Sequence, residues 1–108
     1  MALGVMTWKL PVTGPSDQYA ERARTSWIPT VLAQSGVTEF RGYRTQGRDF
    51  LMVRTETEFT SLELAEQWMN SAEYERINGE LADHGATEMA VETWDASPLL
   101  PDALRPGS

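Results

Sequence analysis

The chain has 108 residues and a mass of 12.1 kDa, the size of one domain with its own hydrophobic core. Apolar residues make up 41% of it and charged residues 23%, so its composition excludes disordered, collagen-like and coiled-coil proteins. It contains no cysteine, which excludes disulfides, thiolate metal sites and cysteine nucleophiles. Its net charge of -7 argues against nucleic-acid binding, because such binding depends on neutralising phosphates.

The sequence shows no pattern of a membrane span or an export signal. No apolar run approaches the ~18 residues that a span needs, and the first residues lack a basic flank. We therefore expect a cytoplasmic protein with no membrane partner. Residues 1–54 hold seven basic and four acidic side chains, whereas residues 55–108 hold two basic and twelve acidic ones. This asymmetry fits a solvated acidic helix face, or a basic half that meets an acidic half within the chain or across a dimer.

The first third of the chain predicts a strand followed by a helix. Residues 3–10 are apolar, with β-branched and aromatic members, and end at a proline. Ser16 or Asp17 can cap a helix, in which apolar residues recur at three-to-four spacing over 19–32. Pro29 falls inside this pattern and predicts a kink or a restart just before it. Gly36 then closes the helix.

The middle of the chain predicts a β-hairpin. Residues 37–45 and 50–59 have strand composition and flank a short connection that contains Gly47. Val37, Arg41 and their alternating neighbours are expected on one face. Neither face is cleanly polar, which indicates that both faces of the sheet are partly covered.

The last third predicts a second helical region and a final strand. Thr60 to Glu63 matches a capping box, and apolar residues then continue at helical spacing as far as Leu81. A second cap at 70–73 predicts a break and restart of the helix. Residues 87–95 read as the last strand. The proline-rich stretch 97–108 is either an arm laid on apolar surface or a frayed tail.

The β-α-β-β-α-β order is that of a ferredoxin-like α+β domain, with a four-stranded antiparallel sheet and both helices on one face. We assign this domain to residues 1–96 and the C-terminal arm to 97–108. The second face of such a sheet stays open in a monomer. Its mixed apolar character predicts that a second copy covers it in two-fold symmetry.

Several kinds of chemistry lack a signal in this sequence. The single histidine, His84, has no metal-ligand spacing, and no glycine-rich loop for a nucleotide or nucleophile elbow is present. We therefore expect no metal and no built-in cofactor.

The sequence resembles the dimeric α+β barrel superfamily and, within it, the antibiotic biosynthesis monooxygenases. The resemblance spans roughly residues 3–100 and rests on the element order, on SLELAEQWMNSAEY at 61–74 and on VETWDASP at 91–98. It implies two four-stranded sheets that form a homodimeric barrel. It also implies cofactor-independent oxidation of a small aromatic or polyketide-like substrate by dioxygen. A non-catalytic ligand-binding or stress-associated barrel protein is the main alternative, and a cyclase, isomerase or decarboxylase is a third.

The resembled oxidation needs an ionised substrate, a dry aromatic pocket and donors aimed at the developing oxyanion. The candidate catalytic residues are Trp68, Arg41 and Asn78. The candidate substrate-binding residues are Trp27, Tyr43, Tyr74 and His84. Each also has a structural interpretation: the aromatic residues as core, His84 as a helix cap, and the arginines as partners of neighbouring carboxylates.

Two details of the resemblance narrow the chemistry. One of Arg41, Arg44 and Arg54 is a candidate to hold an anionic substrate. The haem-degrading branch of the superfamily carries a ligating histidine ten residues after a tryptophan that Trp68 matches. Asn78 stands at that position here and His84 comes six residues later, so haem ligation is not expected.

Overall fold

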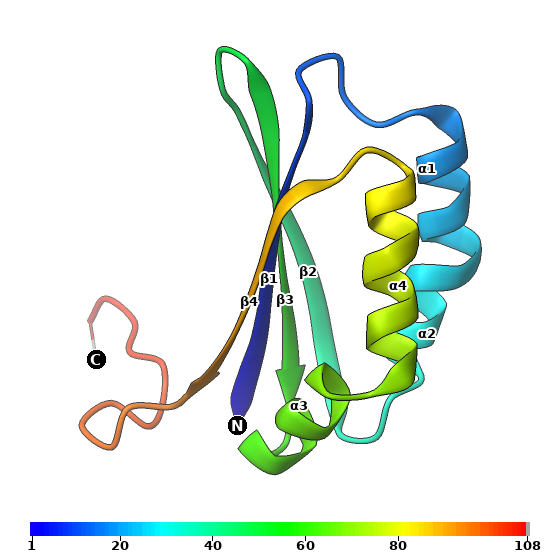
Figure 1. Ribbon diagram of the computed structural model, residues 1–108. Coiled ribbons are helices and arrows are strands. Elements are labelled where there is room, and N and C mark those ends of the chain that lie inside the picture. The colour runs from blue at the N-terminus through cyan, green and yellow to red at the C-terminus, as the bar shows by residue number, and fades with distance from the viewer. Residues whose placement is uncertain (108) are drawn as a thin grey trace.

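The computed structural model describes residues 1–107 and shows one antiparallel sheet with all its helices packed on one face (Figure 1). The strands lie in the order β2-β3-β1-β4, so the first strand and the third occupy the centre. This is the predicted ferredoxin-like arrangement. The elements in chain order are β1 (Ala2–Pro11), α1 (Asp17–Arg22), η1 (Ala23–Trp27), α2 (Ile28–Leu32), β2 (Val37–Gln46), β3 (Phe50–Phe59), α3 (Leu62–Met69), α4 (Ala72–Asp83) and β4 (Thr87–Asp95).

The first helical region is interrupted where Pro29 predicts a restart. Pro29 lacks a backbone N–H, and its ring clashes with the carbonyl of the residue four positions earlier. The helix accommodates this with one π-helical turn, η1, in which the Ile28 N–H bonds the Ala23 carbonyl five residues back. A regular helix then resumes at Ile28. Such single π turns frequently occur at functional sites.

Serine side chains cap the N-termini of three of the helices. Ser16 accepts from the Tyr19 N–H at 3.1 Å, and Ser71 accepts from the Tyr74 N–H at 3.1 Å, as the sequence predicts. The predicted capping box at 60–63 is wrong by one residue. Ser61 is the actual cap and accepts from the Leu64 N–H at 3.2 Å, so a leucine stands where the box requires a glutamate.

The pairing of β1 with β3 separates the two faces of the sheet. Met6 pairs with Thr55 and Trp8 with Val53 on the face that carries the helices. The core lies between this face and the helices, and Phe59 is fully buried there. The alternate residues of both strands point to the other face, which we call the open face.

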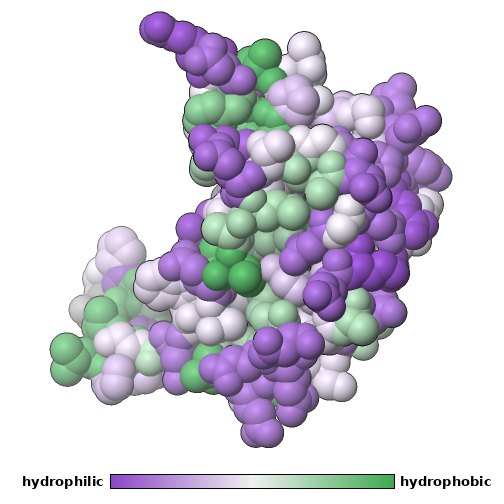
Figure 2. Space-filling model, in the orientation of Figure 1, coloured by the Kyte–Doolittle hydropathy of each residue, from purple (hydrophilic) through white to green (hydrophobic). Residues whose placement is uncertain are grey.

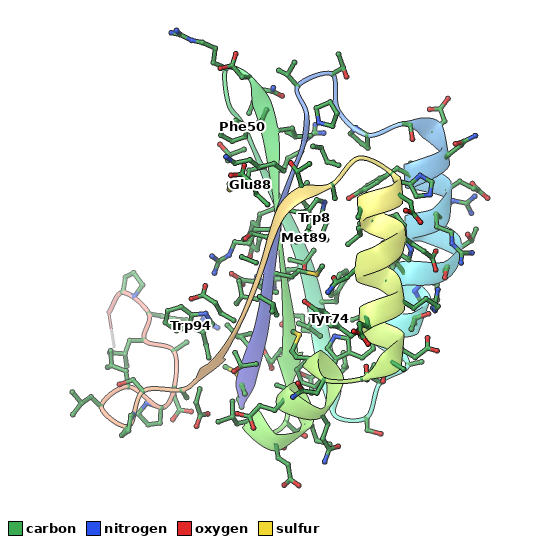
Figure 3. The ribbon with its side chains drawn as sticks, in the orientation of Figure 1. Trp8, Phe50, Tyr74, Glu88, Met89 and Trp94 are labelled. Atoms are coloured by element: carbon green, nitrogen blue, oxygen red, sulfur yellow. The ribbon has the colours of Figure 1, made fainter. Side chains whose placement is uncertain are left out.

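Among residues 1–107, no helix or loop forms a layer over the open face. Figure 2 shows this face as a hollowed side of the molecule, between the β2–β3 hairpin and the C-terminal segment. Charged and apolar residues are mixed on this face. Arg54 Nε donates to Glu56 Oε2 at 2.9 Å, whereas Trp94 is 53% exposed. Trp94 points away from the helices and Tyr74 lies on the helix side (Figure 3).

Lys9 joins three strands at the hairpin end of the open face. Its Nζ lies 2.7 Å from Glu88 Oε2 on β4 and 4.2 Å from the centre of the Phe50 ring on β3. Glu88 sits in a β-bulge with a φ of 50°, in the left-handed region. The two contacts hold the edge strand β4 at the point where its register changes.

The C-terminal segment leaves the sheet on the side opposite the helices (Figure 1). It turns at once, since the Leu100 N–H bonds the Ser97 carbonyl at 3.0 Å. Its leucines are largely exposed, with Leu99 at 89% and Leu104 at 72%. Within residues 1–107, no helix is long and apolar enough to cross a membrane.

Glu80 on α4 ties the two helical regions together. Its Oε1 lies 2.5 Å from Arg22 Nε on α1 and accepts from Trp27 Nε1 at 3.2 Å, while its Oε2 binds Arg76 at 2.5 Å. These contacts lower the pKa of Glu80 to about 2. The hydrogen bond from Arg22 is the main cause, and the hydrogen bonds from Trp27 and Arg76 contribute to the lowering.

Because the pKa of Glu80 is lower in the folded chain, Glu80 stabilises the fold above the ordinary carboxyl pKa of 4.5 and loses this effect as the pH falls towards 2. We expect Glu80→Gln to lower the free energy of unfolding at pH 7 and the difference from wild type to shrink towards pH 2. Urea unfolding across this pH range measures it. Glu75→Gln, an exposed change on the same helix, is the control. A difference that stays constant with pH contradicts the assignment.

Phe59 anchors the core where β3 ends. We expect Phe59→Ala to lower the free energy of unfolding by about 3–5 kcal/mol, because it removes a buried ring and leaves a cavity. Urea denaturation followed by tryptophan fluorescence measures the loss. Thr45→Ala on exposed β2 should change stability by less than about 0.5 kcal/mol. Equal effects of the two changes would place the core elsewhere.

Candidate functional site

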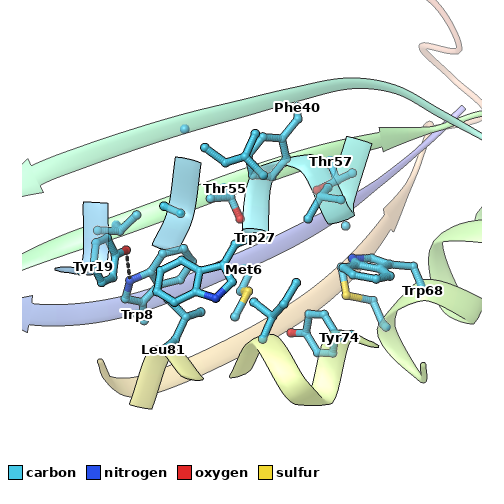
Figure 4. Close-up of a pocket in the computed structure, with 18 residues that line it drawn as sticks. Met6, Trp8, Tyr19, Trp27, Phe40, Thr55, Thr57, Trp68, Tyr74 and Leu81 are labelled. Atoms are coloured by element: carbon cyan, nitrogen blue, oxygen red, sulfur yellow. Dashed lines mark hydrogen bonds between the residues drawn. The ribbon is translucent and has the colours of Figure 1, made fainter. Parts of the chain in front are cut away.

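An apolar cavity of about 200 Å³ lies between the helices and the sheet (Figure 4). Its walls are formed by residues from the strands β1, β2 and β3 and from the helical segments α1, η1, α2, α3 and α4. Six aromatic side chains line it: Trp8, Tyr19, Trp27, Phe40, Trp68 and Tyr74. Concave sites with apolar, aromatic walls and few polar groups are the usual form of small-molecule pockets.

One glycine and two threonines shape the floor of the cavity. A Cβ at Gly4 on β1 would collide with the terminal methyl group of Met69, so the glycine leaves room for this side chain between α3 and the sheet. Thr55 and Thr57 on β3 bring hydroxyl groups to the same floor. They alternate with glutamates in the sequence TETE at 55–58, and this alternation is the signal by which the sequence could have identified them.

Hydrogen bonds fix two of the tryptophans in the wall. Trp8 Nε1 donates to the Tyr19 hydroxyl at 3.1 Å, the dashed line in Figure 4. Trp27 Nε1 donates to Glu80 Oε1. Buried indole N–H groups normally find such partners. The two rings are therefore held by polar contacts at their edges, which leaves their faces for the cavity and for each other.

Trp68 and Tyr74 form the opposite wall. Their ring centres lie 5.6 Å apart with the planes at 76°, an edge-to-face contact. Burial raises the pKa of the Tyr74 hydroxyl, and the nearby Asn78 side chain offsets part of the rise. Burial also raises the pKa of Tyr19, against the effect of Trp8. Both hydroxyls are therefore neutral near pH 7, and Tyr74 can serve there as a hydrogen-bond donor but not as a base.

Asn78 lies one helical turn beyond Tyr74 on α4. Its Oδ1 is buried and accepts no hydrogen bond from any residue in the range 1–107. An unpaired buried amide oxygen is costly, so a role beyond packing is a reasonable explanation for it. Asn78 does not itself line the cavity but lies behind Tyr74.

Besides Asn78, the structure places three of the sequence-predicted residues outside the cavity. Arg41 and Tyr43 lie on the open face, where Arg41 Nε donates to Glu39 Oε1 at 2.7 Å. His84 caps the end of α4, and its ring packs edge-on against Trp27 at 5.7 Å and Tyr19 at 6.5 Å. The cavity thus brings together Trp27, Trp68 and Tyr74, with Asn78 behind them, and leaves out Arg41, Tyr43 and His84.

The walls carry little ionisable chemistry. The residues that line the cavity include no aspartate, glutamate, histidine, lysine or arginine. Among residues 1–107, no group of three or more histidine, aspartate or glutamate side chains is placed to hold a metal ion. The polar groups at hand are the hydroxyls of Tyr19, Thr55, Thr57 and Tyr74.

Known proteins resemble this chain in structure but not detectably in sequence. No family model matches the chain, and no curated protein matches it in sequence. A candidate antibiotic biosynthesis monooxygenase from Deinococcus radiodurans is similar in structure over the full length of both chains, with a TM-score of 0.66 and 12% identity.

Two further solved structures are similar. An ethyl tert-butyl ether D family protein from Bacillus halodurans matches 90% of this chain and all of its own, with a TM-score of 0.59 and 14% identity. A protein from Mycobacterium tuberculosis matches over the full length of both chains, with a TM-score of 0.56 and 13% identity. The chain therefore shares the fold of these structures, the ferredoxin-like α+β arrangement that its sequence predicts.

Proposed function

We propose that the protein binds a small aromatic or polyketide-like molecule in the cavity and oxidises it with dioxygen, without a cofactor. The observation that carries this proposal is the aromatic cavity, in which Trp68 and a neutral Tyr74 hydroxyl meet. The likeness in fold to a candidate antibiotic biosynthesis monooxygenase supports it.

The reaction that fits this site converts an activated ring CH₂ group to a ketone. One CH₂ and one O₂ give one C=O and one H₂O, so dioxygen is the only oxidant needed. The substrate must ionise to an enolate or phenolate that donates electrons to dioxygen. Since the cavity walls hold no ionised base, a substrate that is itself acidic near neutral pH fits best.

Each residue near the cavity has a role in this proposal. Tyr74 donates to the developing oxyanion, a contact worth far more in a dry site than in water. Trp68 and Trp27 form the walls and exclude water. Asn78 positions the Tyr74 hydroxyl. His84 acts only through its packing on Trp27.

Non-catalytic binding of a similar molecule is the second candidate function. The observation that favours it is the same lack of an ionisable base in the walls, because an enzyme of less acidic substrates would need one. Tight binding without oxygen consumption distinguishes this function from the first.

We further propose that the open face pairs with that of a second copy to form a homodimer. β4 is exposed along its length, and Trp94 presents an apolar ring on this face. Arg41 and Tyr43 then belong to the interface rather than to the cavity. In this dimer the exposed leucines of the arm would reach the partner, because residues 97–107 project on this side (Figure 1).

Oxygen uptake tests the oxidation. With a hydroxylated anthrone as substrate, we expect one O₂ consumed per quinone formed. Tyr74→Phe should lower kcat about 100-fold, as loss of an oxyanion donor does. Trp68→Phe should lower it less, because an aromatic wall remains.

Thr45→Val, which removes an exposed hydroxyl of β2 that lines neither the cavity nor the groove beside it, is the control and should leave kcat unchanged. Uptake that is the same in wild type and Tyr74→Phe would contradict the assigned role. Binding of the anthrone with no uptake in any variant would establish the non-catalytic function instead.

Light scattering on a sizing column tests the homodimer. We expect a mass near twice 12.1 kDa that persists on dilution into the micromolar range. Trp94→Glu should produce the monomer, since it places a charge in the proposed interface. Leu32→Glu, an equally exposed apolar site on α2, should leave the mass unchanged. A wild-type monomer under these conditions would rule out the dimer.

A further inference from the structure

Three arginines on the β2–β3 hairpin differ in where they point and in what they bind. Arg41 and Arg54 lie on the open face and are held by Glu39 and Glu56. Arg44 lies on the helix-facing side, because it pairs in register with Val53, which lines the cavity. Within residues 1–107, Arg44 makes no ion pair and no side-chain hydrogen bond.

An unpaired arginine at this place is unusual for the chain. Acidic residues outnumber basic ones sixteen to nine, and six of the basic residues have a carboxylate partner. The other two unpaired arginines are Arg48, in the hairpin turn, and Arg105, in the C-terminal segment. Of these three, Arg44 lines the groove beside the cavity.

The groove that Arg44 lines adjoins the cavity. Arg44 shares it with its β2 neighbours Gly42 and Tyr43 and with apolar residues at the start of α1 and on β1 and β3. Tyr19, Gly42 and Val53 line both the groove and the cavity. A molecule that extends from the cavity past these shared residues therefore reaches the groove that Arg44 lines.

Gly42 keeps this passage open. Its register partner Thr55 lies in the cavity floor, so a side chain at Gly42 would point to the same side. A Cβ there would meet no atom within 4 Å. The position is thus an unfilled gap between groove and cavity, and the strand geometry at Gly42 does not require a glycine.

The volume of the cavity limits what it can enclose, so a larger molecule would need the gap at Gly42. An apolar cavity of about 150 Å³ holds benzene, so one of about 200 Å³ holds little more than one or two rings. A larger planar molecule must extend through the gap at Gly42. Its outer end then lies in the groove beside the guanidinium of Arg44.

We propose that Arg44 determines specificity for a planar, apolar molecule that bears an anionic oxygen group on its outer end. This inference rests on the proposed function and names the class of molecule more narrowly. A guanidinium binds carboxylate or phenolate oxygens through two parallel N–H donors, which orients as well as attracts the anion. The inner rings of the same molecule are then directed at Trp68 and Tyr74.

Two fluorescent probes with one ring system test this. 1-Anilinonaphthalene-8-sulfonate carries an anionic group, and N-phenyl-1-naphthylamine lacks it. We expect wild type to bind the sulfonate more tightly. Arg44→Gln should weaken sulfonate binding about fivefold to tenfold, as loss of a charged hydrogen bond does, and leave the neutral probe unchanged.

Two further variants serve as controls. Arg48→Gln removes an unpaired arginine four residues away and should change neither affinity. Gly42→Val fills the gap with a good strand residue, so it should weaken both probes while circular dichroism and thermal unfolding show an intact fold.

The outcomes separate the two levels of the proposal. If both probes bind through the gap but Arg44→Gln weakens neither or both equally, the role of Arg44 is wrong and the cavity remains a binding site. If neither probe binds, or Gly42→Val leaves both affinities unchanged, the cavity does not take such molecules, and the proposed function fails with the inference.

Discussion

The register between the two central strands is the constraint on which the rest of the structure depends. β1 and β3 pair over ten residues, Ala2 with Phe59 at one end and Pro11 with Phe50 at the other. Because side chains alternate between faces, a slip of β1 by one residue would move Met6 and Trp8 to the open face, and a slip of β3 by one residue would bring Glu56 into the core. The position of the cavity, the charges on the open face and the exposure of β4 all follow from this one alignment.

Polar contacts at the edges of the aromatic rings keep the space beneath the helices open. The Trp8–Tyr19 hydrogen bond and the Glu80 cluster hold large rings by their edges. Rings held in this way cannot rotate freely to fill the space between them, so helix and sheet meet over a cavity instead of closing on it. The π turn of η1 contributes by placing Trp27 in the wall while it absorbs the strain of Pro29.

The sequence predicts the elements well because their signals are local. A proline, a serine cap or an alternating stretch acts within a few residues, so the breaks near Ile28 and Ser71 could be predicted. Trp27, Trp68 and Tyr74 are among the site residues that the sequence predicts, and they line the cavity, whereas the other four predicted residues do not. Which of the hairpin arginines lies on the cavity side could not be predicted in the same way, because it depends on which face of β2 meets the helices.

A β-bulge between Val37 and Glu39 explains why the sequence alone does not predict which face of β2 meets the helices. Simple alternation puts Val37 and Arg41 on one face, and Val37 is apolar, which favours that face for the core. The bulge inserts one residue, so Val37 packs with the core while Arg41 turns to the open face. Nothing in the local composition marks the extra residue. Arg44 is therefore brought to the cavity side by a backbone irregularity seven residues away, and its importance emerges only when the strand register is known.

The electrostatics of the cavity constrain the chemistry more tightly than its shape does. Its walls carry hydroxyl groups and no ionised side chain, and burial keeps Tyr74 protonated near neutral pH. An uncharged apolar site repels a bare anion unless a positive group lies within reach. Arg44 at the end of the groove is the one cation that lines either of these adjoining spaces within residues 1–107. A molecule that ionises inside the cavity and one that carries an anionic substituent in the groove both gain from the same guanidinium, so the requirements of binding and of oxidation converge on an acidic aromatic molecule.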